Sequence, residues 1–152
     1  MSLINNCINN VTPAKFCSFL AVKTTNQTIN HGVTTQVTFD TEIYDSGSNF
    51  ASNTFTAPIT GLYQFYVLIS ASRVVDVADL IYINVNGAPA AQTYMQYDTG
   101  DIFNAQYIAV ALSLNATDTA SVNYFNTTTL STVTIQGQVS PYQTYFGGYR
   151  IA

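Results

Sequence analysis

The chain has 152 residues, of which 47% are hydrophobic and 13% aromatic, so it can form one domain around a continuous core and is not disordered. Charged residues make up only 8%, against about 25% in an ordinary soluble domain. With 4 Lys and Arg, a net charge of -4 and no apolar stretch of bilayer length, we expect neither nucleic-acid binding nor membrane insertion.

The first half of the chain shows short runs of β-branched and aromatic residues separated by turn signals, which predicts strands and no helix. The expected strands are Phe16–Val22, Thr35–Asp45, Thr54–Thr56 and Leu62–Ala71. The last of them places Phe65, Val67 and Ile69 on one face and Tyr66 and Leu68 on the other. Because both faces are apolar, we expect one face to meet the core and the other to meet a partner.

The second half begins with a hairpin signal, Asn86-Gly87, because both residues tolerate a positive φ. The expected strands are Leu80–Val85, Ala88–Tyr94, Tyr107–Leu114, Ala120–Phe125, Val133–Val139 and Tyr145–Ile151. Ten strands at this spacing predict an all-β fold, a ten-stranded antiparallel jelly-roll sandwich. Residues 1–15 are expected to be a leader or a linker to a stalk, and residues 16–152 a single head domain.

A series of aromatic, acidic and glycine residues runs through the middle of the chain at fixed spacing: Phe39, Asp45, Phe50, Phe55, Gly61, Tyr63 and Phe65. Together with the segments 85–89 and 145–151, and with Asp118 before Val122, this series resembles the globular head of complement C1q. Two departures are a spacer shortened by two residues between Phe50 and Phe55, and Val67 at a usual aromatic position. The resemblance covers residues 16–152 and implies a C1q/TNF-like jelly roll that forms a homotrimer. The Asn- and Thr-rich composition also suits a bacterial, phage or viral member.

Glycines next to aromatic residues predict close packing. Gly61 suits a tight corner where a side chain would clash, and Gly147-Gly148 indicates close approach of another backbone or ring. The aromatic side chains expected to be buried in the core are Tyr63, Phe65, Phe146 and Tyr149.

Catalytic chemistry is not indicated. His31 is the single histidine, so one chain cannot form a histidine triad or a multi-histidine metal site, and we name no catalytic residue. Cys7 and Cys17 are interpreted as unpaired thiols with Cys17 in a buried strand, although a bridge within or between chains stays open. Asp76 with Asp79, and Asp98 with Asp101, are interpreted as hydrated pairs in polar loops.

A calcium site is expected to be missing. Calcium-binding members of the resembling family carry Tyr-Asp-Gln-Tyr and, further on, an Asp near the trimer axis. This chain has Tyr94-Met95-Gln96-Tyr97, with Phe103 at the later position. We therefore expect no cofactor, and an apolar plug formed by Met95 and Phe103, while Asp98 and Asp101 leave a displaced site open.

These observations predict a non-enzymatic recognition or adhesion head that binds itself as a homotrimer and binds a cell-surface glycan or a protein receptor through loops. The expected interface or axis residues are Tyr66, Leu68, Tyr94, Met95, Tyr97, Phe103 and Phe146. The ligand-binding loops are expected to include Arg73, Asp76, Asp79, Asp98 and Asp101. The alternative is a structural trimerisation tip of a microbial or viral fibre, or the head of a collagen-like protein. In each case the expected location is extracellular, at a cell surface or on a virion.

Overall fold

The computed structural model describes residues 17–72, 78–96, 103–127 and 132–152, and for residues 95, 96 and 103 it describes the backbone alone. Across these residues the chain forms strands and no helix, so no helix there is long and apolar enough to span a membrane. The predicted all-β class is confirmed. The strands are β1 Ser18–Val22, β2 Gln27–Ile29, β3 Thr34–Gln36, β4 Thr41–Asp45, β5 Phe50–Ala51, β6 Thr54–Thr56, β7 Gly61–Ser72, β8 Ala78–Val85, β9 Ala88–Gln96, β10 Phe103–Leu114, β11 Thr119–Asn126, β12 Val133–Ile135 and β13 Tyr145–Arg150.

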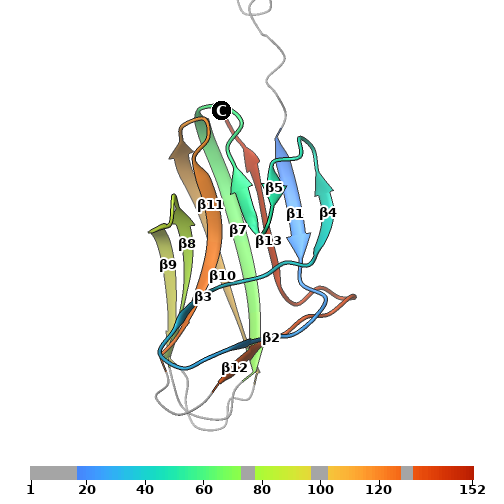
Figure 1. The fold of residues 1–152 in the computed structure, drawn as a ribbon, viewed down its shortest axis with the longest axis vertical. Coiled ribbons are helices and arrows are strands. Elements are labelled where there is room, and N and C mark those ends of the chain that lie inside the picture. Colours follow the sequence, from blue (N-terminus) through green and yellow to red (C-terminus); the bar gives the residue numbers. More distant parts are fainter. Residues whose placement is uncertain (1–16, 73–77, 97–102, 128–131) are drawn as a thin grey trace, which may run out of the picture.

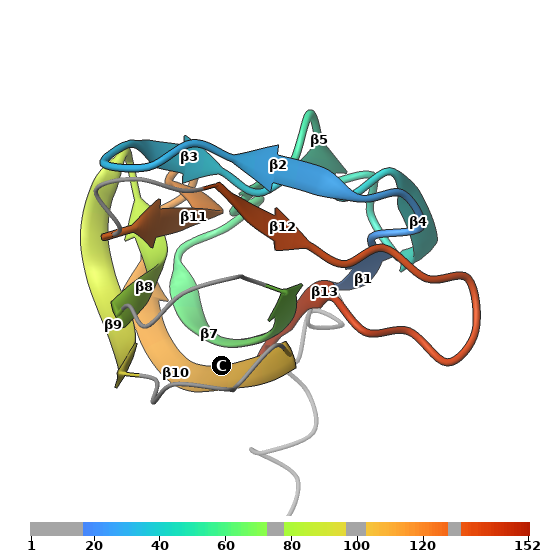
Figure 2. The same cartoon turned by 90° about the horizontal axis from the view of Figure 1, so that it is seen from below.

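Two antiparallel sheets pack against each other as a sandwich (Figure 1, Figure 2). The first sheet has the order β2-β12-β7-β13-β1-β4, and β10 also pairs with β7 over the full length of both strands. The second sheet has the order β5-β6-β11-β8-β9, with β3 also paired to β11. Neighbouring strands in each sheet are mostly far apart in the sequence, as in a jelly roll.

The expected strand Thr35–Asp45 is divided between the two sheets: β3 pairs with β11 in the second, and β4 pairs with β1 in the first. The amide of Val37 still donates to a carbonyl of β11 at 2.9 Å, whereas the amide of Phe39 donates to Asn53 Oδ1 at 2.7 Å. The chain therefore crosses from one sheet to the other at residues 37–40. Alternation of side chains continues through the crossing, so the sequence pattern does not reveal it.

The expected strand Val133–Val139 is also shorter than predicted and ends at Ile135. Gly137 packs against the loop after β1, and its amide donates to Asn26 Oδ1 at 2.9 Å. A Cβ at Gly137 would lie 2.3 Å from the backbone of Thr25. The close approach of two loops at this glycine turns the chain out of the sheet, and residues 136–144 then form the wide loop between β12 and β13 (Figure 2).

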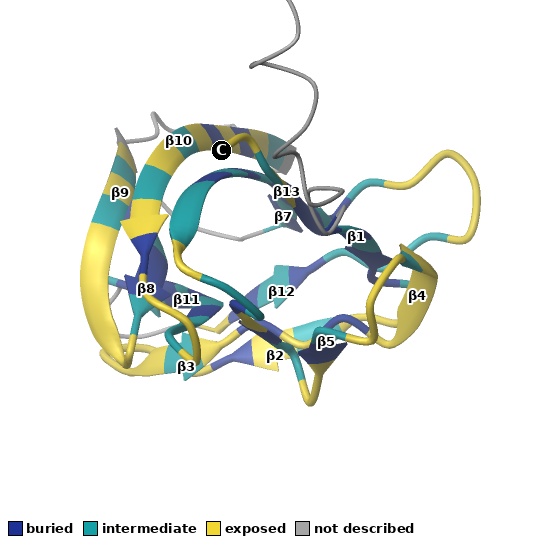
Figure 3. Cartoon of the chain, turned by 90° about the horizontal axis from the view of Figure 1, so that it is seen from above, coloured by how far each residue is buried: buried dark blue, intermediate teal, exposed yellow. Residues whose placement is uncertain are grey.

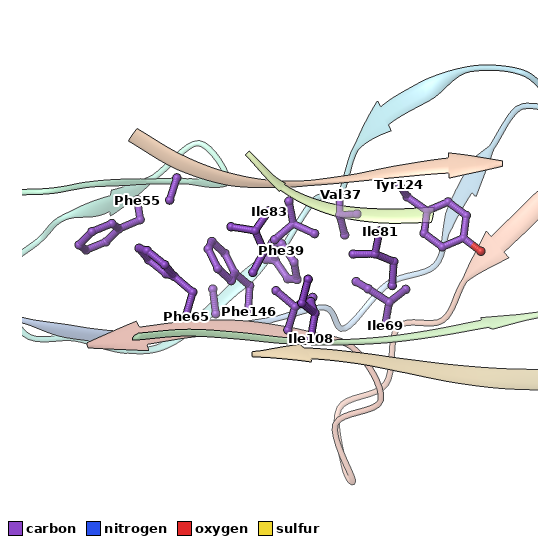
Figure 4. Close-up of a cluster of buried hydrophobic side chains, with 14 of the residues drawn as sticks. Val37, Phe39, Phe55, Phe65, Ile69, Ile81, Ile83, Ile108, Tyr124 and Phe146 are labelled. Atoms are coloured by element: carbon purple, nitrogen blue, oxygen red, sulfur yellow. The ribbon is translucent and has the colours of Figure 1, made fainter. Parts of the chain in front are cut away.

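The core between the sheets combines aromatic rings with isoleucine and valine side chains (Figure 4). Phe146 is fully buried, with its ring centroid 5.0 Å from that of Phe19 and 5.9 Å from that of Phe65. Tyr63 and Phe65 are fully buried as predicted, and the Tyr63 hydroxyl donates to the carbonyl of Ile59 at 2.6 Å. The prediction was wrong for Tyr149, which is 44% exposed because it points to the solvent side of β13.

A buried lysine joins the loop after β1 to the segment before β4. Lys23 is 1% exposed, and its Nζ donates to the carbonyl and hydroxyl oxygens of Thr38 at 2.9 and 2.7 Å. Burial lowers the pKa of this ammonium, and the negative charge of Asp40 partly offsets the effect. Asp40 accepts hydrogen bonds from the amides and hydroxyls of Thr24 and Thr25 at 2.6 to 3.0 Å. Although its partial burial acts in the opposite direction, these bonds hold the pKa of Asp40 well below its usual range.

Candidate functional site

The solvent side of the first sheet carries a cluster of five tyrosines, which we call the tyrosine face. They project from β4, β7, β10 and β13. Tyr107 is 57% exposed, Tyr44 45% and Tyr149 44%, while Tyr66 and Tyr145 are half-buried. Solvent-facing positions of an antiparallel sheet are normally polar, so this aromatic surface is the feature of the described residues that most needs a partner.

Strand pairing arranges the tyrosine face in rows across the sheet. In one row, Leu68 of β7 lies between Tyr107 of β10 and Tyr145 of β13. In the next row, the Cα partners follow in the order Ala109, Tyr66, Gly147, Leu20 and Tyr44. In a third row, they follow in the order Ala111, Gln64, Tyr149 and Ser18. None of these residues is charged, and Figure 3 shows β10 alternating between exposed and more buried positions along this face.

The tyrosine hydroxyls interact within the face. The hydroxyls of Tyr44 and Tyr66 lie 3.4 Å apart, and the rings of Tyr66 and Tyr145 meet edge to face with centroids 6.3 Å apart. Burial, the hydrogen bond with Tyr44 and the neighbouring tyrosines all raise the pKa of Tyr66 above its usual value. The pKa of Tyr145 is also raised, by burial and by Tyr107. Tyr66 and Tyr145 are therefore neutral at physiological pH, and the rows of the face contain no charged residue that would attract a cation or an anion.

A glycine allows the Tyr66 ring to lie close to the sheet. A Cβ at Gly147 would be 2.5 Å from Cζ and the hydroxyl oxygen of Tyr66, and one at Gly148 would be 2.7 Å from the ring of Phe65. The predicted close approach of a ring at this glycine pair is confirmed. The prediction for Gly61 is confirmed as well, since a Cβ there would be 2.3 Å from the carbonyl oxygen of Ala152.

Of the predicted interface residues whose side chains the structure describes, Tyr66 and Leu68 lie on the tyrosine face. Tyr94 is 56% exposed and pairs with Leu80 on the outer side of the second sheet. Met95 pairs with Asp79 through β9, but the side chains of Met95 and Phe103 lie outside the described part of the structure. The prediction was wrong for Phe146, because a side chain with no exposed surface in one protomer cannot contact another.

Most of the predicted ligand-binding residues lie outside the described part of the structure: Arg73, Asp76, Asp98 and Asp101, together with the predicted interface residue Tyr97. Asp79 is described, and the prediction that it lies in a hydrated loop was wrong. It is fully buried in β8, and the Tyr124 hydroxyl donates to its Oδ2. Asp79 thus supports the interior of the second sheet rather than presenting a carboxylate to a ligand.

Other predicted features have simple outcomes. His31 lies exposed in a turn, as expected, and Cys17 is buried with Asn49 Nδ2 3.5 Å from its sulfur. Among the described residues, no group of three or more His, Cys, Asp or Glu side chains gathers to hold a metal ion. The segment 23–32 contains the buried Lys23 and the short strand β2, so only part of it is available to a ligand.

Sequence reasoning missed Tyr44, Tyr107, Tyr145 and Tyr149 as members of one surface. Their positions within strands were predicted, but their assembly depends on pairing between strands far apart in the chain, such as β1 with β13 and β7 with β13. One signal was present: in β10, Tyr107 is followed at alternate positions by Ala109 and Ala111, whose small side chains leave a sheet face open to a partner.

Comparison with known proteins identifies the family. The family model of the C1q domain matches residues 18–151, while no match was found among curated proteins. Among solved structures, the globular domain of zebrafish complement 1qA protein is similar with a TM-score of 0.62 and 14% identity, covering 90% of this chain and 98% of that one. The structure of Eiger TNF from S. frugiperda is similar with a TM-score of 0.60 and 19% identity, covering 90% of this chain and 93% of that one. These likenesses establish the jelly-roll fold, and because the family model spans nearly the whole chain, this chain belongs to the C1q domain family.

Proposed function

We propose that this domain is a non-enzymatic recognition head that assembles into a homotrimer through its tyrosine face and binds a glycan or protein receptor with the surfaces left free. The observation that carries the proposal is the row of exposed, uncharged aromatic side chains on the solvent side of the first sheet. C1q/TNF-like domains support it, because they are trimeric heads that often mediate recognition, are typically extracellular and are generally not enzymes.

Burial of the tyrosine face supplies a driving force for assembly. Complete burial of a large side chain stabilises by about 1.5–3 kcal/mol, so each half-exposed tyrosine contributes about 1 kcal/mol when a partner covers it. Tyr44, Tyr107 and Tyr149 are all exposed to this degree. Closed symmetry around an axis covers the same face on every protomer and leaves the ends of the sandwich available to a ligand, where weak single sites gain from threefold avidity.

The assembly is tested by placing a charge in the tyrosine face. We expect the wild type to have three times the protomer mass of 16.5 kDa in light scattering, and Tyr107→Glu to have the mass of a monomer, because a buried carboxylate without a partner opposes association. Tyr142→Glu is the matched control, since Tyr142 is 41% exposed in the loop between β12 and β13. Far-UV circular dichroism checks that each variant is folded. A monomeric wild type at micromolar concentration, or a Tyr107→Glu trimer as stable as the wild type, contradicts this interface.

The extent of the interface is tested separately at Tyr94. Since Tyr94 was expected near the axis, we propose that the contact reaches from the tyrosine face around β10 to β9, so that Tyr94→Glu also weakens the trimer. If Tyr94→Glu keeps the mass and stability of the wild-type trimer, the interface is confined to the first sheet.

Recognition is tested with the trimer on a glycan array and on cells before and after enzymatic removal of surface glycans. Binding lost on deglycosylation identifies a glycan, and binding that persists identifies a protein receptor. A trimer that binds neither the array nor any cell surface contradicts the recognition function and favours the structural tip.

A further inference from the structure

Asn86 is the only asparagine of the chain followed by glycine, and it lies at the tip of the β8–β9 hairpin. Asn86 and Gly87 have φ values of 51° and 81°, so they form the central residues of a tight turn with the left-handed conformation of both residues. Both residues are exposed. An exposed Asn-Gly pair in a flexible chain is the sequence most prone to spontaneous deamidation, because the glycine amide is not shielded by a side chain.

The side chain of Asn86 is held by the neighbouring hairpin. Its Nδ2 donates to Asp118 Oδ1 at 2.8 Å, and its Oδ1 accepts from the amide of Thr119 at 2.9 Å. The amide of Asn86 also donates to the carbonyl of Thr119 at 3.0 Å. Both ends of the side-chain amide are thus engaged, which fixes its orientation relative to the backbone of Gly87.

Asp118 is fixed from several directions. Its Oδ2 accepts from the amide of Asn115 at 2.7 Å, and its carbonyl accepts from the amide of Ala57 at 2.8 Å. The hydrogen bonds from Asn86 and Asn115 hold the pKa of Asp118 below its usual value, so the carboxylate is ionised at neutral pH. Asn86 therefore donates to a carboxylate whose position is fixed by its own β10–β11 turn and by Ala57 in the segment after β6.

We propose that Asn86 is a latent deamidation site that Asp118 keeps closed, and that its conversion to a carboxylate loosens the link between the two hairpins. In the reaction, the backbone nitrogen of Gly87 attacks Cγ of Asn86, and Nδ2 leaves as ammonia to give a cyclic imide. Water then opens the imide to aspartate or isoaspartate. No oxidant or enzyme takes part, and the protein gains one negative charge.

The geometry explains both the protection and the consequence. The attack requires the side-chain amide to leave Asp118 and Thr119 and swing toward the Gly87 nitrogen, so the reaction proceeds only when the turn opens. After conversion, residue 86 has no Nδ2 to donate, and its new carboxylate faces the carboxylate of Asp118. Like charges at this distance repel, and the hydrogen bond from residue 86 to Asp118, one of those that join the β8–β9 and β10–β11 turns, is lost.

The protection is tested by peptide mapping with mass spectrometry after incubation in mildly alkaline buffer. We expect Asn86 in the wild type to deamidate at least about tenfold more slowly than in a free peptide spanning residues 83–89, because the closed turn must first open. In the Asp118→Ala variant, Asn86 is expected to deamidate nearly as fast as in the free peptide, because the hydrogen bond that holds its side chain is gone. Asp40→Ala is the matched control: it removes another hydrogen-bonded carboxylate on a different loop and is expected to leave the rate at Asn86 unchanged. Equal rates in the wild type and the peptide, or an unchanged rate in Asp118→Ala, overturn the proposal.

The consequence is tested with Asn86→Asp, which reproduces the aspartate product, in which the backbone keeps its normal connectivity. We expect a lower melting temperature than the wild type at neutral pH, and a difference that shrinks below about pH 4, where one of the two facing carboxyl groups takes up a proton. An Asn86→Asp protein as stable as the wild type at neutral pH overturns the second half of the proposal. Oligomeric mass is measured on the same samples, so failure of this inference is separable from failure of the trimer.

Discussion

Replacement of Phe146 by alanine removes a ring that four other core rings surround. Their centroids lie 5.0 Å away for Phe19, 5.8 Å for Phe39, 6.0 Å for Phe50 and 5.9 Å for Phe65. Truncation of a buried phenylalanine to alanine costs about 3–5 kcal/mol. Because this side chain has no exposed surface and its neighbours are rigid rings, we expect a loss of about 4–5 kcal/mol in the free energy of unfolding. Phe146→Leu keeps most of the apolar volume and is expected to lose about 1–2 kcal/mol.

The assay is urea unfolding followed by circular dichroism at two protein concentrations. Loss of core packing lowers the stability of Phe146→Ala by the same amount at both concentrations, since the lost contacts lie within one protomer. The comparison variant is Tyr107→Ala on the tyrosine face, which weakens assembly and is therefore most destabilised at the lower concentration.

The result that would refute this reasoning is a loss below about 1 kcal/mol in Phe146→Ala. A variant that changes its mass in solution while keeping the stability of each protomer would also refute it, because Phe146 would then act between protomers. The second outcome would restore the interface role that was predicted for Phe146.

Three further predictions concern single loops and close contacts. The pKa of Asp40 is lowered in the folded state, so the carboxylate stabilises the fold fully above the unfolded pKa of about 4, and this stabilisation is lost as the pH falls toward the folded pKa. In denaturation curves, Asp40→Asn should lower the free energy of unfolding by about 1 kcal/mol at pH 7 and by less below pH 4. Gly147→Ala forces the Tyr66 ring off the sheet, and we expect a loss of about 1–3 kcal/mol with weaker assembly in light scattering. In Gly137→Ala the new methyl group meets the backbone of Thr25, which cannot rotate away. Thermal unfolding should therefore show a loss of about 2–3 kcal/mol in the free energy of unfolding, with an unchanged oligomeric mass. Unchanged stability in any of the three would contradict the corresponding contact.

Local sequence patterns were sufficient for the all-β fold. The alternation within Leu62–Ala71 placed Phe65, Val67 and Ile69 inward, and all three are fully buried or nearly so. The hairpin at Asn86-Gly87 was recognisable because its two left-handed residues are those that tolerate this conformation. The short strands β2 and β5 were missed, since two or three residues are too few to show a period.

The candidate site depended on information that no single segment contains. Tyr107 and Tyr145 become neighbours of Leu68 only through the pairing of β7 with β10 and β13. Asp79 was assigned to a loop because of its charge, although its alternation with the buried Ile81 and Ile83 indicated an inward position. Its burial depends on the Tyr124 hydroxyl, and a partner so distant in sequence cannot be identified from the pattern of one strand.

The buried Lys23 has a consequence for the resistance of the domain to proteases. A trypsin-like protease must draw a basic side chain into its specificity pocket, and the side chain of Lys23 is held inside by Thr38. The other basic residue in the described part of the chain is Arg150, which lies in β13 and is paired with Tyr63 of β7. Cleavage at either site must wait for local opening of the fold, so the same scarcity of charge that leaves the surface to Thr and Asn also gives trypsin-like proteases few basic residues to cleave after.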